Sequence, residues 1–275
     1  MLERVLPDWA LGAYFEQGKG VRWAQPQNQN GAAAWVEGRI DERLVFVFIE
    51  GDGRAWRTRS IRAADPTPSQ AVAAQLANRT ASKSKVLYLA RPCQFFDDRA
   101  LARLKECEPK LWTDDRYSSD TIKVISNALD AGLGVIGQQL VLVGYSGGGV
   151  VAALLAAQRS DVVGLITIAA NLDVDAWTSH HRVSLLHRAL LPVNYADQLS
   201  EIPQYHLLGT KDAVVPKVVH DSYLAALGDM TRVKTVYVDG YDHSCCWSES
   251  WLDHLYKALA YFNDNSSGVG ITSHE

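Results

Sequence analysis

The sequence predicts an α/β protein with one doubly wound, mostly parallel sheet and a small lid insertion. Short apolar runs rich in β-branched and aromatic residues alternate with amphipathic stretches at helical spacing. The apolar runs are nearly continuous, which is typical of parallel strands covered by helices on both faces. Of the 275 residues, 47% are hydrophobic, so the chain can bury a substantial core. We therefore expect a single domain over residues 1–275.

The first thirty or so residues are polar and irregular, and the alternation of segments begins after Gly31. The segments predicted as strands are Leu44–Ile49, Lys85–Ala90, Gln139–Tyr145, Val162–Ala169, Gln204–Gly209 and Lys234–Val238. The segments predicted as helices are Thr121–Ala131, Gly148–Gln158, Val218–Leu227 and Ser248–Phe262.

Two stretches break this pattern. Asn171–Ile202 separates two strands and is predicted to form a small helical lid over the sheet edge. Its Leu, Trp and Val residues predict one wall of an apolar acyl pocket, and Trp177 is a candidate substrate-binding residue. Asn263–Glu275 is rich in Asn, Ser and Gly and is predicted to be a frayed tail. The core of the domain is then expected from about Ala33 to Phe262.

Charge and hydropathy exclude several kinds of partner. Lys and Arg total 27 against 31 Asp and Glu, a net charge of −4 without a basic cluster, so no nucleic-acid partner is expected. No apolar run reaches the roughly 18 residues of a membrane span.

Met1–Gly20 carries Glu3, Arg4, Pro7 and Asp8 where a signal peptide needs an apolar run, so we expect no export signal. As it stands the sequence indicates the cytoplasm, and the bacterial periplasm or envelope stays open if a leader has been removed. The oligomeric state is not predicted.

The most specific motif is Gly144-Tyr-Ser-Gly-Gly148, between a predicted buried strand and a helix of small residues. In this context G-x-S-x-G places the serine, here Ser146, on a tight turn that projects its hydroxyl above the sheet. The amide of Gly147 would lie at the helix N-terminus, where it can stabilise an oxyanion. A purely structural glycine turn is one alternative. A phosphate loop is the other, but it needs Gly-Lys-Ser/Thr, which is absent here.

A serine nucleophile needs a base and an acid, which on this kind of sheet follow in the order Ser, acid, His. Asp212 and His243 each come just after a later predicted strand, at the edge where parallel sheets bind ligands. Asp212 could instead be a turn residue that bonds to its own backbone. The rival acids are Asp173, Asp175, Asp239 and Asp242. The rival histidines lie in a predicted strand, on predicted helices, in the lid or in the tail: His206, His220, His254, His180, His181 and His274.

The second oxyanion donor should come from the loop after the first central strand. That loop reads Glu50-Gly-Asp-Gly53, and we assign the backbone N–H of Asp52 as the partner of Gly147. A plain Asp-Gly turn is the alternative. Gly51 and Tyr145, which flank these two donors, are candidate substrate-binding residues.

Together these motifs resemble the α/β-hydrolase superfamily over roughly Ala33 to Phe262. More narrowly, the chain is similar to an uncharacterised group of bacterial esterase/lipase-like hydrolases. The stretches that carry this similarity are Glu50-Gly-Asp-Gly53, Ala90-Arg-Pro-Cys-Gln94, Trp112-Thr113 with Arg116-Tyr-Ser118, Gly144-Tyr-Ser-Gly-Gly-Gly149, Asn171-Leu-Asp173 and Asp242-His-Ser-Cys-Cys-Trp247. Members of the group often carry an export or lipoprotein signal, and this sequence departs from them there. The superfamily motif is specific for the fold and poorly specific for the substrate.

The residues and the resemblance both predict a serine hydrolase of carboxylic esters that needs no metal or organic cofactor. Thioesterase or lysophospholipase chemistry on the same triad stays open, as does a non-catalytic binding protein on the same scaffold. A metal site at His243, Cys245 and Cys246 is disfavoured because adjacent cysteines seldom both reach one ion.

Four cysteines are too few for a fold built on disulfides. Cys93 follows a predicted strand and Cys107 ends the amphipathic run Asp97–Glu106, so a helix could fold back and join them. We predict this bridge in an oxidising compartment and four free thiols in the cytosol. Cys245 and Cys246 are adjacent, and we expect no bridge between them.

Overall fold

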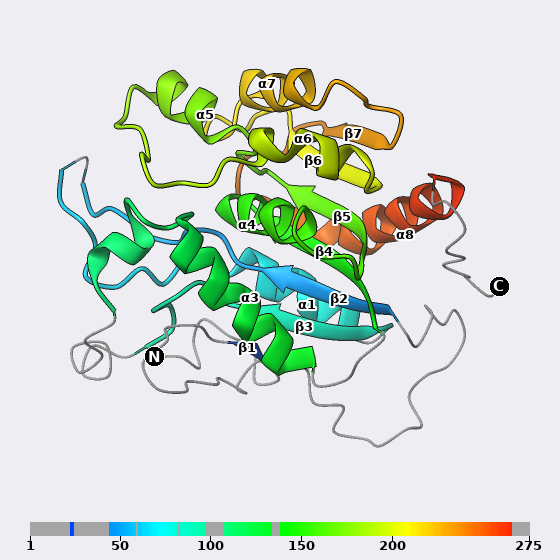
Figure 1. Ribbon diagram of the computed structural model, residues 1–275, viewed down its shortest axis with the longest axis horizontal. Helices are drawn as coiled ribbons and strands as arrows, with labels where there is room; N and C mark the ends of the chain where they lie inside the picture. The colour runs from blue at the N-terminus through cyan, green and yellow to red at the C-terminus, as the bar shows by residue number, and fades with distance from the viewer. Residues whose placement is uncertain are drawn as a thin grey trace.

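One β-sheet organises the part of the chain that the structure describes (Figure 1). This computed structural model describes residues 23–24, 44–58, 60–81, 83–96, 107–133 and 138–265. Within those ranges seven strands lie in the order β1-β3-β2-β4-β5-β6-β7. Their bounds are β1 Trp23–Ala24, β2 Leu44–Ile49, β3 Lys85–Leu89, β4 Gln139–Tyr145, β5 Val162–Ile168, β6 Gln204–Gly209 and β7 Val233–Val238. Strands β2 to β7 pair in parallel, and the two-residue β1 is antiparallel to β3 at the edge.

The predicted doubly wound, mostly parallel sheet is confirmed. Strands β2, β4 and β6 have the predicted bounds, and the other three predicted strands differ by one residue at one end. Strand β1 was not predicted. It has only two residues, so its side chains show no periodicity that would indicate a strand.

Helices cover both faces of the sheet, as Figure 1 shows. Helices α1 (Val72–Ala81) and α8 (Trp247–Asn265) pack together on one face. Helices α3 (Ser119–Leu133), α4 (Gly147–Ala156) and α7 (Lys217–Leu227) contribute to the apolar layer on the other face. Helix α1 was not predicted. Three of the six residues that it buries are alanine.

Each face of the sheet has its own apolar layer. On the α1 and α8 side Phe48 and Trp251 meet edge to face at 5.7 Å, and the Trp251 indole N–H donates to Thr80 Oγ1 at 2.8 Å. On the other side every residue of α4 is buried. A fully buried large apolar side chain contributes about 1.5–3 kcal/mol. The two layers therefore hold the carboxyl ends of the strands in fixed positions, where the predicted site residues lie.

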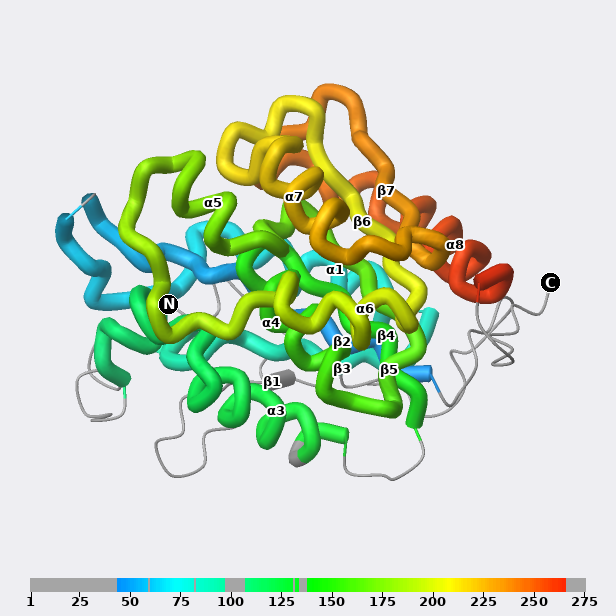
Figure 2. Tube along the Cα trace, turned by 45° about the horizontal axis from the view of Figure 1, so that its top comes forward, coloured from blue at the N-terminus to red at the C-terminus, as the bar shows by residue number. Residues whose placement is uncertain are grey.

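The predicted lid contains α5 (Val174–His181), a 3₁₀ turn at Pro192–Tyr195 and α6 (Ala196–Ser200). It leaves the carboxyl end of β5 and runs across α4 to α6 (Figure 2). The Leu190 N–H donates to the carbonyl of Tyr117 at 2.9 Å, which attaches the lid to the loop before α3.

At the C-terminal end α8 continues to Asn265, three residues beyond Phe262, and residues 266–275 of the predicted tail lie outside the described residues. In the described ranges no helix has the length and apolar character to cross a membrane. The assignment of residues 1–275 to one domain stays a prediction.

Candidate active site

Ser146 lies at the turn between β4 and α4 in a backbone conformation that non-glycine residues rarely adopt, with φ 51° and ψ −125°. Such conformations persist where the surroundings enforce them, and they are concentrated at functional sites. Here close packing of the neighbouring backbone holds the turn in this conformation. A Cβ on Gly148 would overlap the backbone oxygens of Ile49 and Glu50, so only glycine lets α4 approach the end of β2 this closely. The turn therefore holds the serine hydroxyl at the carboxyl edge of the sheet.

The loops after β6 and β7 bring an acid and a histidine to Ser146. His243 Nε2 lies 3.0 Å from Ser146 Oγ, and His243 Nδ1 lies 2.9 Å from Asp212 Oδ2. The Asp212 side chain is 1% exposed and that of His243 is 20% exposed. Asp212 Oδ1 also accepts the N–H groups of Val214 and Val215, both at 2.8 Å. Asp212 is thus both a turn residue bonded to its own backbone and the carboxylate that contacts the histidine.

The rival acids serve other contacts. Asp173 caps α5 through the Ala176 N–H at 2.9 Å and accepts the Ser222 hydroxyl at 2.6 Å. Asp239 accepts the Thr210 hydroxyl at 3.1 Å. Among the described residues no hydrogen bond joins Asp173, Asp175, Asp239 or Asp242 to the His243 ring.

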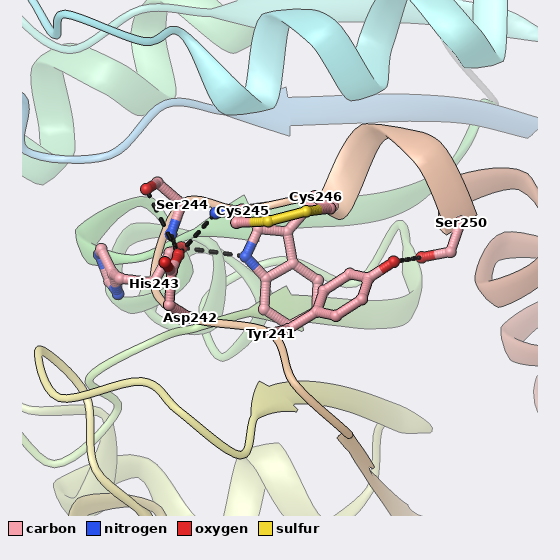
Figure 3. The surroundings of a disulfide bond; sticks show 8 residues. Tyr241, Asp242, His243, Ser244, Cys245, Cys246 and Ser250 are labelled. Carbon is pink, nitrogen blue, oxygen red and sulfur yellow. Dashed lines mark hydrogen bonds between the residues drawn. A yellow bond between two sulfur atoms is a disulfide. The ribbon is translucent and has the colours of Figure 1, made fainter.

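The backbone of His243 is held by two aromatic side chains. Its carbonyl oxygen accepts the Tyr145 hydroxyl at 3.1 Å and the Trp247 indole N–H at 3.0 Å. Burial raises the pKa of Tyr145, so its hydroxyl stays protonated and can donate. Asp242 Oδ1 accepts the N–H groups of Ser244 and Cys245, which closes the turn (Figure 3). Tyr145, a candidate substrate-binding residue, is therefore buried against the histidine loop.

The structure departs from our expectation at Cys245 and Cys246, which it joins in a disulfide at the start of α8 (Figure 3). We expected no bridge because adjacent cysteines must adopt an unusual local conformation. The backbone does so here: Cys246 has φ 146°, a region that non-glycine residues rarely enter. Among the described residues no group of three or more His, Cys, Asp or Glu side chains could hold a metal ion.

The structure also joins Cys93 to Cys107, with the two Cα atoms 5.7 Å apart. The run 97–106 that was expected to fold back as a helix lies outside the described residues. Cys93 has φ 67° in the turn after β3, so the bridge ties down a turn of unusual backbone conformation.

The loop after β2 carries the second predicted oxyanion donor, Asp52, and a buried carboxyl that sequence reasoning missed. Glu50 Oε1 accepts the N–H of Gly51 at 3.0 Å, and Glu50 Oε2 accepts the Tyr88 hydroxyl at 3.0 Å. Burial raises the Glu50 pKa from 4.5 to about 7, and these hydrogen bonds partly offset that rise. The Gly51 carbonyl accepts from the Gln94 side chain at 2.9 Å. Gly51, a candidate substrate-binding residue, is thus fixed on both sides.

The two predicted oxyanion amides have no acceptor among the residues that the structure describes. In the described ranges we find no hydrogen bond from the N–H of Gly147 or of Asp52, and the first amide of a helix has no partner within the helix. The Asp52 side chain, in contrast, is heavily engaged. It accepts from Arg91 Nη1 at 2.7 Å and from the Tyr117 hydroxyl at 2.6 Å, and it lies 3.0 Å from Arg116 Nε.

The lid places Trp177 near this cluster. The Arg116 guanidinium lies over the Trp177 ring at 6.0 Å, and the Trp177 indole N–H donates to the Val214 carbonyl at 2.7 Å. His181 Nε2 lies 2.8 Å from the same carbonyl, and the His180 ring packs against that of His181. Trp177 therefore connects the lid to the loop that carries Asp212.

Residues Arg91, Gln94, Arg116 and Tyr117 were not assigned a role from the sequence. They stand in two of the stretches that carry the narrower resemblance, and that was the available signal. Their convergence on the loop of Asp52 depends on contacts 39 to 65 residues apart in the chain, which a linear motif does not encode.

The chain matches no protein-family model and no curated protein sequence, but solved structures resemble it. A candidate dienelactone hydrolase of Klebsiella pneumoniae is 18% identical, with a TM-score of 0.53 and coverage of 88% of this chain and 91% of the other. A puromycin-hydrolysing peptidase of Mycobacterium tuberculosis is 16% identical, with a TM-score of 0.57 and coverage of 95% and 39%. A carboxylesterase of Nitrososphaera gargenis is 12% identical, with a TM-score of 0.55 and coverage of 92% and 100%. With the sheet order above, these similarities show that the chain has the α/β-hydrolase fold.

Proposed function

We propose that this protein is a serine hydrolase that cleaves carboxylic esters through an acyl-enzyme. The observation that carries the proposal is the chain of contacts from Ser146 Oγ to His243 Nε2 at 3.0 Å and from His243 Nδ1 to Asp212 Oδ2 at 2.9 Å. A nucleophile in contact with a base, and a base in contact with an orienting acid, is the arrangement that activates serine.

In the proposed reaction Ser146 Oγ attacks the ester carbonyl carbon and its proton passes to His243 Nε2. Asp212 keeps the neutral ring in the tautomer with the proton on Nδ1 and stabilises the imidazolium that forms. The carbonyl electron pair becomes an oxyanion, which accepts from the N–H groups of Gly147 and Asp52. When the carbonyl reforms, the alcohol leaves and takes the proton from Nε2. Water then repeats the sequence on the acyl-enzyme and releases the carboxylic acid.

We propose a small-molecule ester with a short to medium acyl chain as the substrate class. The lid is short and attached to α4, and its Trp177 lies under the guanidinium of Arg116, which contacts Asp52, so Trp177 can wall an acyl pocket there. The similarity to a candidate lactone hydrolase and to a carboxylesterase supports ester chemistry. Thioesters and lysophospholipids are the alternatives on the same triad.

The test is labelling with a fluorophosphonate probe together with a chain-length series of p-nitrophenyl esters. We expect the wild-type protein to be labelled, and Ser146→Ala to lose labelling and at least about a thousandfold in kcat. Ser200→Ala is the matched control, because Ser200 lies in α6, just before the amino end of β6 and away from the triad edge. Turnover in Ser146→Ala near the wild-type value would overturn the proposal. Absence of both labelling and turnover would favour a binding protein.

A further inference from the structure

We propose that Arg91, Arg116 and Tyr117 form a charge clamp on the Asp52 carboxylate, which positions the Asp52 amide as the second oxyanion donor and neutralises that carboxylate beside the oxyanion. This inference rests on the proposed function and adds three positioning residues to it. None of the three is placed in contact with substrate.

The clamp holds the carboxylate from three directions. Arg91 Nη1 donates to Oδ1 at 2.7 Å, while the Tyr117 hydroxyl donates to Oδ2 at 2.6 Å and Arg116 Nε lies 3.0 Å from the same oxygen. The two arginine side chains are 4% and 7% exposed, whereas that of Asp52 is 20% exposed. The hydrogen bonds from Arg91 and Tyr117 fix the position of the carboxylate, and Arg116 adds an ion pair.

The arginines are themselves fixed by backbone carbonyls. Arg91 Nη2 donates to the carbonyl of Arg116 at 2.6 Å, and Arg116 Nη1 donates to that of Thr113 at 3.0 Å. Gln94 accepts the Arg91 N–H at 3.0 Å and donates to the Gly51 carbonyl at 2.9 Å. The clamp and the backbone on the amino side of Asp52 thus form one connected network.

The clamp lies directly beside the first oxyanion donor. A Cβ added to Gly147 would overlap both the Asp52 carboxylate and the Tyr117 hydroxyl, so glycine is required there by the clamp itself. An ionised carboxylate this close to both donors would repel the developing oxyanion, because Coulomb interactions at a few ångströms are strong in a partly buried site. Two guanidinium groups remove that repulsion.

The protonation states agree with this arrangement. Burial would lower the pKa of Arg116 and is the largest single effect, but the Asp52 and Asp114 charges and Tyr117 together outweigh it and the pKa is raised. Burial and the same charge raise the pKa of Tyr117, so its hydroxyl stays a donor. Arg116 therefore keeps its charge and Tyr117 its donor hydroxyl across the neutral pH range.

The decisive comparison is Tyr117→Phe with Tyr223→Phe. Both remove one buried hydroxyl that donates at 2.6 Å, in one case to Asp52 and in the other to Gln204 in β6. We expect Tyr117→Phe to lower kcat about tenfold with KM unchanged, because an oxyanion donor acts mainly in the transition state. Affinity for phenylboronic acid, which forms a tetrahedral adduct on Ser146, should fall by the same factor. Tyr223→Phe should lower the Tm without changing either quantity.

A second pair tests the charge. Arg116→Gln should lower kcat about a hundredfold, and Arg116→Lys should recover part of that loss. Arg159→Gln is the matched control, because Arg159 forms ion pairs of 2.6 Å with Asp130 and Asp161 at the far end of α4. If Arg116→Gln fails to fold, the comparison of Tyr117→Phe with Tyr223→Phe still tests the clamp.

The outcomes separate the two proposals. Wild-type protein that is labelled and turns over, with Tyr117→Phe unchanged in kcat and boronate affinity, overturns the clamp alone. Equal effects of Tyr117→Phe and Tyr223→Phe on kcat reduce the clamp to a structural role and also overturn it. A wild-type protein that is neither labelled nor active overturns the proposed function, and the clamp with it.

Discussion

Replacing Glu50 with glutamine should remove a pH dependence of stability that arises at the start of the loop after β2, which carries Asp52. The Glu50 side chain is fully buried between the loop and the first turn of α1. Oε1 accepts the N–H groups of Gly51 at 3.0 Å and Ala73 at 3.4 Å, while Oε2 accepts the Tyr88 hydroxyl at 3.0 Å and the Ala74 N–H at 3.3 Å. Four donors favour the ionised carboxylate, and burial opposes it.

Burial is the larger effect, since it raises the Glu50 pKa from 4.5 to about 7 against those donors. Between these two pH values the native state holds a proton that the unfolded chain has released. The contribution to the free energy of unfolding is therefore fully present below pH 4.5 and is lost as the pH rises through 7. At about 1.4 kcal/mol per pKa unit the total loss is about 3 kcal/mol.

The assay is urea unfolding of the wild-type protein and Glu50→Gln at several pH values from 4.5 to 8. The quantity to follow is the free energy of unfolding of the wild type minus that of the variant. Contributions common to both proteins cancel in this difference, and a mispaired glutamine amide shifts it by a constant. We expect the difference to fall by about 3 kcal/mol over the range. Glu249→Gln, on the exposed side of α8, is the control and should give a flat difference.

A flat difference for Glu50→Gln would refute the claim that folding shifts the pKa of this carboxyl. A difference that grows with pH would mean that the α1 N-terminus and the four donors outweigh burial. Glu50 would then be an ionised anchor of the loop after β2.

Three further changes test other parts of the structure. Asp212→Asn keeps an oxygen for the backbone N–H groups of its own turn but not the carboxylate at His243, so kcat for ester hydrolysis should fall about a thousandfold or more with little change in Tm. Replacing Cys93 and Cys107 together by serine should lower the free energy of unfolding of the oxidised protein by about 3 kcal/mol in urea, for a loop of 14 residues. Burial lowers the pKa of His220 to about 4, so stability should fall as the pH drops from 6.5 towards 4, and His220→Gln should remove about 3 kcal/mol of that fall in acid titration.

The sheet was predictable from the sequence because its central strands are buried on both faces. Strands β2, β4 and β6 read as unbroken apolar runs, and their bounds match the prediction. Strand β1 pairs with β3 over only two residues, so it leaves no pattern that stands out from its flanks. Three of the six residues that α1 buries are alanine, whose small side chains contribute little burial of their own. The failures are therefore elements whose stability comes from pairing and context rather than from their own side chains.

The positions of Ser146, Asp212 and His243 followed from chain order, because the carboxyl ends of parallel strands meet at one edge. The contacts around Asp52 did not follow from the sequence. They require the turn after β3 to hold Cys93 and Phe95 at φ 67° and 63°, conformations that no local preference of these residues predicts. The Cys245–Cys246 bridge was missed for the same reason, since it depends on the unusual backbone at Cys246.

Three of the stretches that carry the narrower resemblance gain a common physical explanation from the loop of Asp52. Glu50 to Gly53, Arg91 to Gln94 and Arg116 to Ser118 lie far apart in the sequence, yet they form one network of buried charges and hydrogen bonds. Burying two guanidinium groups costs free energy that an apolar turn would not require. A packing role alone gives no reason for that cost. The cost is explained if the turn must hold the Asp52 amide still next to a developing negative charge. Substitutions in this turn should then change kcat more than they change stability.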